Sequence, residues 1–311
     1  MRVTLENLPK NTFKLTVTLT AEEIKNSQEK VWNEIAKNAE VDGFRKGHTP
    51  VEMVKQMVDP HKADSEIISD LIKTYYPQAV EEQKLTPVIA PKIELGDFDA
   101  EKEFTFFATS ANRPIATVGD YKKAIKELYD KKNADRSNDG GRVPQQLEES
   151  GAKAGTRDES AAESKHVYLS PNEVIDAITS VTTAEISDLL IDDEVNKMLS
   201  RLVNQVQAVK LDMEAYLKSQ NKTSDSLKAE YAQIAQKNIT GELALLEVVK
   251  TEGVEATDAE VEQTLNAMGD PKLKEQYSKD EYQKAYIRAI IAKNKAIWKL
   301  SSPDEKKEAH E

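Results

Sequence analysis

The chain has 311 residues, of which 39% are hydrophobic, 6% aromatic and 32% charged, and its formal net charge is −12. This acidic balance excludes a general nucleic-acid binder, which would carry a basic surface, and the absence of cysteine excludes disulfides, thiol nucleophiles and cysteine-based zinc sites. Since compact globular chains are usually about 45–50% apolar, the composition predicts an elongated or open molecule rather than one large core.

The N-terminal segment does not resemble a secretory signal, because Glu6 and Lys10 interrupt any apolar run. No run of ~18 apolar residues, the length that spans a bilayer, occurs in the sequence. We therefore expect a soluble, cytoplasmic protein without membrane contact.

The first elements in chain order are a strand and a helix. Residues 12–19 alternate apolar and polar side chains, which predicts a half-buried strand. A capping box of Thr20 and Glu23 then opens a helix over about 21–39. The glycine-containing stretch 41–48 is predicted to be a loop.

Two helices are expected after this loop. The first has Thr49 as its cap and Pro50 at its first position, and it ends at Pro60. The second covers about 62–83, with a kink at Pro77.

Strand-like residues return at 92–95 and 103–109. A strand, helices and returning strands together predict a small α+β domain over residues 1–113.

A change of composition separates this region from the rest. From about residue 131 to 165, charged residues, Ser, Ala and Gly dominate, and almost no large apolar residue follows Leu147. Such a segment cannot bury enough apolar surface to offset its chain entropy. We predict a disordered linker over 114–165, with a short helix at 121–129 leading into it.

Residues 166–300 are predicted to form an all-α domain, followed by a charged, frayed tail at 301–311. Apolar residues recur at helical spacing over 186–209 and again over 225–252, where Gly253 ends the second long helix. Two further helices are expected at the capping boxes Thr257-Asp-Ala-Glu260 and Ser278-Lys-Asp-Glu281.

The most informative segment is the loop Gly43-Phe44-Arg45-Lys46-Gly47-His48-Thr49-Pro50. Its glycines permit a tight, open turn, and an aromatic residue stands beside two cations in an otherwise acidic chain. This combination favours docking on an anionic partner. On spacing alone the ordinary alternative is the better one: Phe44 packs onto the core, and Arg45 and Lys46 are simply solvated.

The pattern G-F-R-x-G-x-x-P is complete at these positions and resembles the ribosome-binding signature of the trigger factor family of chaperones. The residues that match are Gly43, Phe44, Arg45, Gly47 and Pro50, with Lys46 in a variable position that is often basic in the family. The order of elements around the loop is also similar, so the resemblance covers about 1–113. Two further segments, 190–199 and 254–262, resemble parts of the family's C-terminal domain, each weakly.

The resemblance implies an ATP-independent chaperone that assists protein folding and export. The loop, with Gly43, Phe44, Arg45, Lys46, Gly47 and Pro50, would dock on a protein and adjacent rRNA at the exit tunnel of the ribosome. The helical domain would form a cradle that holds unfolded nascent polypeptides. The family also allows a homodimer off the ribosome.

Some helical residues are candidates to face such clients, although packing in the core is the more ordinary expectation for each of them. They are Met198, Leu202, Met213, Tyr216, Met268 and Tyr277.

The chain departs from the family pattern in one respect. Most members carry a prolyl isomerase domain of the FKBP type between the two regions, and such a domain needs strands lined with aromatic residues. Residues 131–165 are too few and too polar for it, and no aromatic residue lies between Tyr129 and Tyr168. We therefore expect no isomerase activity.

Other chemistry has little support in the sequence. The histidines at positions 48, 61, 166 and 310 have no carboxylate at ligand spacing, and no nucleotide-binding glycine loop occurs. We expect no cofactor, no metal and no enzyme. Two binding functions stay open as alternatives: a ribosome-binding regulatory or assembly factor that holds no clients, and a helical adaptor whose Phe44 loop binds another partner.

Overall fold

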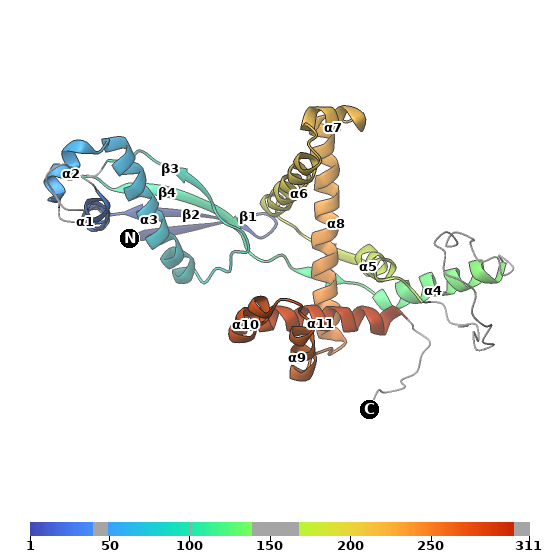
Figure 1. Ribbon diagram of the computed structural model, residues 1–311. Coiled ribbons are helices and arrows are strands. Elements are labelled where there is room, and N and C mark those ends of the chain that lie inside the picture. Colours follow the sequence, from blue (N-terminus) through green and yellow to red (C-terminus); the bar gives the residue numbers. More distant parts are fainter. Residues whose placement is uncertain (40–48, 100, 139–167, 302–311) are drawn as a thin grey trace. The chain divides into compact units, whose positions relative to one another are not determined.

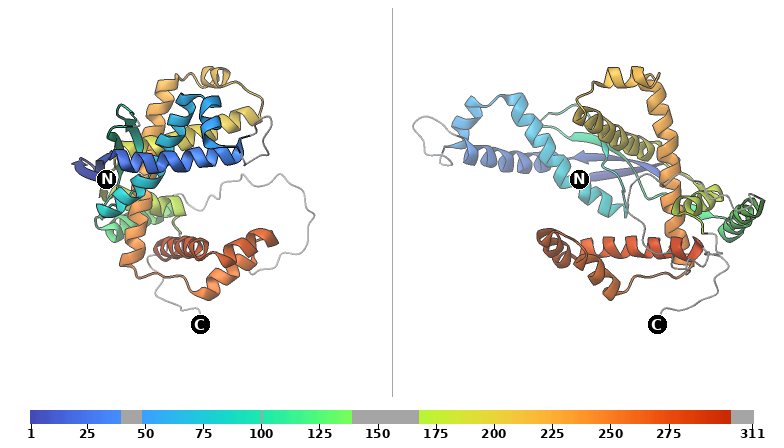
Figure 2. Two further views of the ribbon diagram at one scale, coloured as in Figure 1. Left: turned by 90° about the vertical axis from the view of Figure 1, so that its left-hand side faces the viewer. Right: turned by 45° about the vertical axis from the view of Figure 1, so that its right-hand side comes forward.

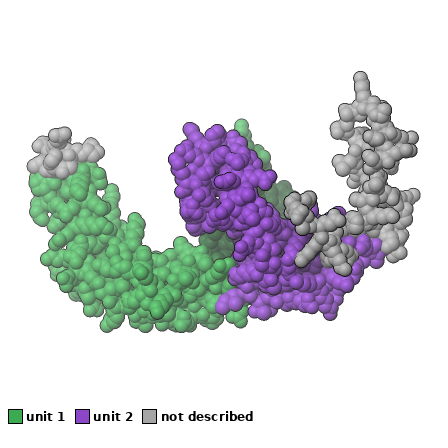
Figure 3. Space-filling view, turned by 90° about the horizontal axis from the view of Figure 1, so that it is seen from below, with its two compact units in different colours: residues 1–114, 185–235 green, residues 115–184, 236–311 purple. Residues whose placement is uncertain are grey.

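The computed structural model describes residues 1–39, 49–99, 101–138 and 168–301 (Figure 1). The contacts divide the chain into two compact units (Figure 3). Unit 1 comprises Met1–Pro114 and Glu185–Ala235, and unit 2 comprises Ile115–Ala184 and Gln236–Glu311. This division differs from the one predicted from the sequence, because residues 185–235 cluster with the N-terminal region.

Unit 1 begins with an antiparallel sheet of strand order β1-β2-β4-β3 (Figure 1). The strands are β1 (Arg2–Leu8), β2 (Thr12–Leu19), β3 (Lys92–Leu95) and β4 (Phe104–Ala111). The sequence predicted β2, β3 and β4 but missed β1. That strand pairs with β2 so that Val3 lies opposite Val17 and Leu5 opposite Leu15.

The helices described in the α+β region are α1 (Ala21–Asn38), α2 (Val51–Met57) and α3 (Pro60–Glu82). One face of the sheet packs with α1 and α3 in a single core. The largest fully buried side chains there are Phe13, Leu15, Leu19, Phe104, Phe106, Ile24, Ile67 and Leu71. The alternation of β2 puts every second residue into this core, so the predicted α+β fold of the N-terminal region is confirmed.

The caps of α1 and α2 show one success and one error of local prediction. Thr20 and Glu23 form the expected capping box of α1. By contrast, α2 begins at Val51 after Pro50, and no side chain caps it, so the prediction of Thr49 as its cap was wrong. Pro60 opens α3 rather than merely ending α2, because a proline at the first helical position lacks an N–H that would be unsatisfied there anyway.

The helices α6 (Asp188–Ala208), α7 (Met213–Ser219) and the first part of α8 (Ser224–Thr251) also belong to unit 1. Their small core buries Leu202, Val206 and Leu227. Two contacts join the start of α6 to the sheet: the Thr12 and Ser187 hydroxyls lie 2.8 Å apart, and Lys10 Nζ lies 2.6 Å from an Asp188 carboxylate oxygen.

In its described residues, unit 2 contains the rest of α8 and five further helices. These are α4 (Tyr121–Asn138), α5 (Pro171–Ser180), α9 (Asp258–Asn266), α10 (Pro271–Lys279) and α11 (Glu281–Ser301). The main core draws on α4, α5, α8 and α11 and includes Ile125, Val174, Ile178, Val248 and Ala296. Gly253, with a φ of 60°, follows the end of α8 as expected.

The helical fold predicted for residues 166–300 is confirmed, and unit 2 corrects three details of the prediction. A two-stranded ribbon pairs β5 (Ala116–Val118) with β6 (Thr182–Ala184), so the region predicted as all-α contains a short strand. Within the predicted linker, residues 116–118 form β5, and the short helix predicted at 121–129 is present but extends to Asn138 as α4. The disorder predicted for the rest of the linker falls on residues 139–165, which lie outside the described residues, and so do nearly all of the tail residues.

The third correction concerns the start of α11. Asp280, rather than Ser278, caps this helix, because its carboxylate accepts hydrogen bonds from the backbone N–H groups of Tyr282 and Gln283. The Ser278 hydroxyl instead donates to the carbonyl of Lys274.

None of the helices in the described part of the chain combines the length and the apolar character that a membrane span requires.

Candidate functional surfaces

The predicted docking loop connects α1 to α2. Its residues Gly43, Phe44, Arg45, Lys46 and Gly47 lie outside the described residues. Pro50 is described, and it is exposed just before the first turn of α2. The roles of these six residues therefore stay predictions.

The supports of this loop are well defined. Asp70 on α3 accepts hydrogen bonds from the Ser27 hydroxyl, at 2.5 Å, and from Lys30 Nζ, at 2.6 Å, both on α1. Burial alone would raise the pKa of the Asp70 carboxyl, but the bonds from Lys30 and Ser27 outweigh burial and lower it. On α2, Val54 is fully buried. The two helices that flank the loop are thus held by buried and charge-assisted contacts.

The surface beside the loop is partly apolar. Met53 and Met57 are exposed on α2, one helical turn apart. A groove of about 490 Å³ between α1 and α2 is mostly polar; it is lined by Lys25, Gln28, Glu29, Trp32, Asn33, Val51, Glu52 and Lys55. Sequence analysis missed both features, because neither methionine belongs to a long periodic pattern.

The clearest apolar surface of unit 2 lies on its last three helices, drawn in orange and red in Figure 2. A groove of about 500 Å³ opens between α9, α10 and α11. Its lining residues are Thr264, Met268, Gly269, Asp270, Leu273, Tyr277, Tyr286, Ile287, Ile290 and Ile291. The base of the groove is firm, since Val261, Leu265 and Ile287 are buried in a small core beneath it.

One row of α11 extends this apolar surface. Tyr282, Tyr286 and Ile290 follow one another at intervals of four residues and are 80%, 58% and 39% exposed. Trp298, about two turns further along α11, is also 74% exposed, but the polar Asn294 separates it from this row and it does not line the groove. Exposed aromatic groups in a contiguous row beside a groove are typical of an interaction surface.

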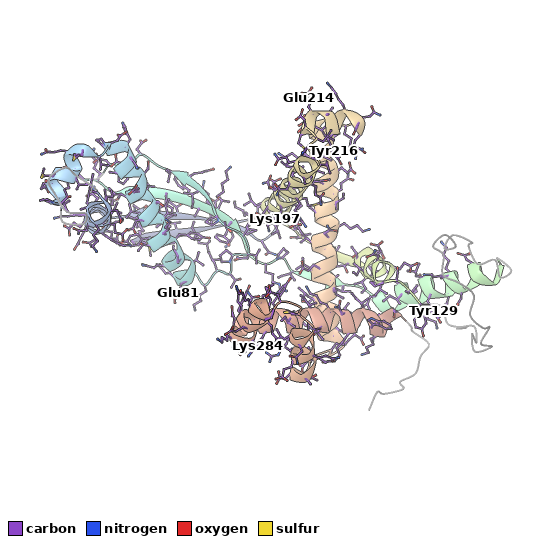
Figure 4. The ribbon with its side chains drawn as sticks, in the orientation of Figure 1. Glu81, Tyr129, Lys197, Glu214, Tyr216 and Lys284 are labelled. Atoms are coloured by element: carbon purple, nitrogen blue, oxygen red, sulfur yellow. The ribbon has the colours of Figure 1, made fainter. Side chains whose placement is uncertain are left out.

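The charged side chains near the groove are mostly paired. Lys284, labelled in Figure 4, lies 2.7 Å from Glu281, Arg288 lies 2.6 Å from Asp258, and Lys279 pairs with Glu275. Such exposed pairs contribute at most about 1 kcal/mol each. Because these charges are paired, the electrostatic field at the apolar row is weak. This surface is therefore suited to binding a partner through apolar contact rather than through charge.

The six residues singled out as client-facing candidates are mostly packing residues. Leu202 is buried, and Met213 and Tyr216, the latter labelled in Figure 4, pack against the same small core of α6, α7 and α8. Met268 and Tyr277 pack against the core of α9 and α11, but they also line the groove. Met198 is partly exposed on α6.

Sequence analysis missed the exposed row of α11, although it identified the apolar residues of that helix. Two rows of apolar residues alternate there, and only one of them is covered. Ile287 and Ile297 are buried, whereas Tyr286 and Trp298, one residue away from each, are exposed.

Among the residues that the structure describes, no three potential metal ligands come together.

Comparison with known proteins covers both regions of the chain. Residues 1–137 match the family model described as bacterial trigger factor protein, and residues 145–302 match the model of its C-terminus. The matches leave only residues 138–144 between them.

Among curated proteins, the trigger factor of Clostridium kluyveri is 31% identical over 137 residues, which are 43% of this chain and 32% of that protein. The trigger factor of Clostridium tetani is 31% identical over 140 residues, or 44% of this chain and 32% of that one. The matched part of the chain thus spans about a third of these relatives' length. A solved structure from work on promiscuous substrate recognition by the trigger factor chaperone has the same fold, with a TM-score of 0.63 at 14% identity, covering 96% of this chain and 99% of that chain.

Proposed function

The chain belongs to the trigger factor family, and we propose that it is an ATP-independent chaperone that docks at the ribosomal exit tunnel and holds nascent polypeptides. The apolar groove and row on α9–α11 carry this proposal. A holdase needs exposed apolar surface that accepts many sequences and releases them, and a shallow groove with adaptable side chains meets that need.

Docking is assigned to the loop between α1 and α2. Its proposed contacts with an exit-tunnel protein and adjacent rRNA come from Gly43, Phe44, Arg45, Lys46, Gly47 and Pro50. The proposal is supported by the complete sequence motif, by the match of the first family model and by the anchored helices on either side. Residues 1–113 would thus dock on the ribosome, and residues 166–300 would hold the client. The protein would act in the cytoplasm, where ribosomes are.

The chain works without prolyl isomerase activity. Support comes from the two family models, which leave only residues 138–144 unmatched between them, and from the absence of aromatic residues between Tyr129 and Tyr168. We also propose that the chain forms a homodimer when it is not on the ribosome.

Client holding has a direct test. The purified chain is expected to suppress the light scattering of an unrelated, chemically unfolded protein at stoichiometric concentrations and without ATP, because exposed apolar surface binds the apolar segments that drive aggregation. A regulatory or assembly factor with the same docking loop would leave the aggregation unchanged. In the same preparation, prolyl isomerisation of a model peptide should proceed at the uncatalysed rate, and faster turnover would contradict the proposed loss of that activity.

A further inference from the structure

The sheet of unit 1 has two edge strands, β1 and β3 (Figure 1). Each pairs with one neighbour, so the backbone N–H and C=O groups on its outer side have no strand partner in the described part of the chain. An open edge of this kind can pair with another chain unless it is protected.

The edge at β3 has the usual protection. It is only four residues long, Pro91 precedes it, and Lys92 and Glu94 are exposed on it. Short length, proline and charged side chains all discourage pairing at an edge. We infer no partner for β3.

The edge at β1 lacks two of these three protections, the short length and the proline. It is seven residues long, contains no proline and no lysine, and keeps a continuous register with β2 from Arg2 to Leu8. Its two charged residues, Arg2 and Glu6, are exposed, and neither forms an ion pair with another described residue. The strand is therefore long, uninterrupted by a bulge and open on one side.

The side chains of β1 divide between the two faces of the sheet. Val3 and Leu5 are half-buried on the face that packs against the helices, whereas Arg2, Thr4 and Glu6 are exposed on the other face. If two copies of β1 pair antiparallel, side chains directly opposite each other share a face. Because faces alternate along a strand, only registers that pair even with even and odd with odd positions keep both apolar faces together.

One such register is complementary along its length. With Thr4 opposite Thr4, Arg2 of each copy faces Glu6 of the other, and Val3 of each copy faces Leu5 of the other. Shifting the axis to Leu5 would place Arg2 opposite Leu8 instead. Shifting it to Val3 would place Arg2 opposite Thr4. Both shifts lose the two opposite-charge pairs.

We propose that β1 is a self-association edge, on which a second copy of this chain docks antiparallel with Thr4 on the two-fold axis. The two sheets then form one continuous sheet of eight strands, with α1 and α3 of both copies on the same face. The inference names the interface of the homodimer proposed above and is independent of ribosome docking and client holding. An unfolded client would not supply the same pattern, because an arbitrary sequence seldom matches both charges and both apolar positions.

Cysteine cross-linking tests the two-fold position directly. The chain contains no cysteine, so Thr4→Cys introduces a single thiol, and any covalent dimer must join the two Thr4 positions. We expect mild oxidation or a short bismaleimide to give dimer, since opposite Cα atoms in an antiparallel pair lie about 4.5–5.5 Å apart. Thr16→Cys is a matched control, because Thr16 lies opposite Thr4 on β2, one strand further inside the sheet. Thr117→Cys, exposed in unit 2, measures collisional cross-linking.

Charge reversal tests the register. In the Thr4→Cys background, Arg2→Glu or Glu6→Arg should each reduce the dimer yield about fivefold or more, because like charges then face each other twice. The combined swap of both residues should restore the yield, since it keeps every pair complementary. Arg2 lies opposite Thr18 on β2, so Arg2→Glu should leave thermal unfolding unchanged, whereas Glu6 lies opposite Lys14, so Glu6→Arg should lower the unfolding temperature slightly.

Three outcomes would overturn the proposal: a Thr4→Cys yield no higher than that of Thr117→Cys, single reversals without effect, or a combined swap no better than either single reversal. Loss of the cross-link on adding an unfolded client protein would also overturn it, because the edge would then belong to clients. Ribosome binding and aggregation suppression by the same variants are measured in parallel. Loss of those activities by the unmodified chain would count against the chaperone proposal and not against the edge.

Discussion

Replacing Tyr282, Tyr286 and Ile290 together by glutamine is expected to weaken the suppression of aggregation about tenfold. These side chains form the exposed row beside the groove of unit 2. Fully burying one such side chain against a client contributes about 1.5–3 kcal/mol, so even partial burial of three predicts a loss of tenfold or more in affinity. Glutamine keeps a high helix propensity, and α11 should stay intact.

The measurement is the chain concentration that halves light scattering by an unfolded client. A matched control, Ala285→Gln with Ala289→Gln, adds glutamine at exposed positions of the same helix without removing a large side chain. If the triple variant loses helicity, Tyr282→Gln alone still tests the surface, because that side chain is 80% exposed. Unchanged suppression by both variants would show that clients bind elsewhere.

The second large effect is expected at Glu252, which joins three segments of unit 2. Its carboxylate accepts a hydrogen bond from the Tyr121 hydroxyl at 2.6 Å and lies 2.8 Å from Lys122 Nζ and 2.7 Å from Lys299 Nζ. The side chain is only 7% exposed. The hydrogen bonds from Lys122, Lys299 and Tyr121 lower the pKa of Glu252 to about 2. Burial and the neighbouring carboxylate raise the pKa of Tyr121 in turn.

Glu252→Gln should lower the free energy of unfolding of unit 2 by about 3 kcal/mol at neutral pH, because it removes a buried, multiply bonded charge. The carboxyl has an ordinary value of 4.5 when unfolded and about 2 when folded. Its stabilisation is therefore complete above pH 4.5 and is lost as the pH falls towards 2. The difference in the free energy of unfolding between the native chain and the variant should therefore become smaller as the pH falls from 4.5 towards 2.

Urea unfolding followed by circular dichroism at several pH values measures this difference. Glu247→Gln is the matched control on α8, because Glu247 is 41% exposed and pairs only with Lys250 among the described residues. We expect it to change stability by less than about 1 kcal/mol. A Glu252→Gln variant as stable as the native chain at pH 7, or a difference that persists at pH 2, would contradict the proposed role.

Local features of the fold could be predicted from the sequence because their causes are local. Apolar and polar side chains alternate along β2, which predicts that one face of the strand is buried. All four apolar residues from Phe13 to Leu19 are indeed fully buried. The capping boxes at Thr20 and Thr257 close hydrogen bonds within four residues. The predicted order of strands and helices in the N-terminal region follows from such patterns.

Features that depend on distant partners could not be predicted. The pairing of β5 with β6 joins Thr117 to Thr183, and nothing in either three-residue segment identifies the other. Gly119 marks the same contact, because a Cβ there would lie 2.8 Å from the carbonyl oxygen of Val181. The strand β1 was not predicted, because an edge strand needs few apolar residues and its sequence pattern is therefore weak.

Competition between neighbouring groups explains the error at the start of α11. Ser278 and Glu281 have the spacing of a capping box, but Asp280 lies closer to the first turn of α11 and accepts its N–H groups. Similarly, periodicity identifies the apolar residues of α11 without showing which row is covered. The candidate client surface therefore became visible only with the packing of α9 and α10 against that helix.

Docking of the chain on the ribosome through the loop between α1 and α2 can be measured by co-sedimentation with purified ribosomes. The native chain is compared with a variant carrying Phe44→Ala, Arg45→Ala and Lys46→Ala. A control variant with Lys102→Ala and Arg113→Ala also removes one lysine and one arginine, but from exposed positions elsewhere in unit 1.

We expect the native chain and the control to pellet with ribosomes, whereas the triple variant should stay in the supernatant and still suppress aggregation. Absence of the native chain from the ribosomal pellet, or equal pelleting of the triple variant, would contradict the docking claim.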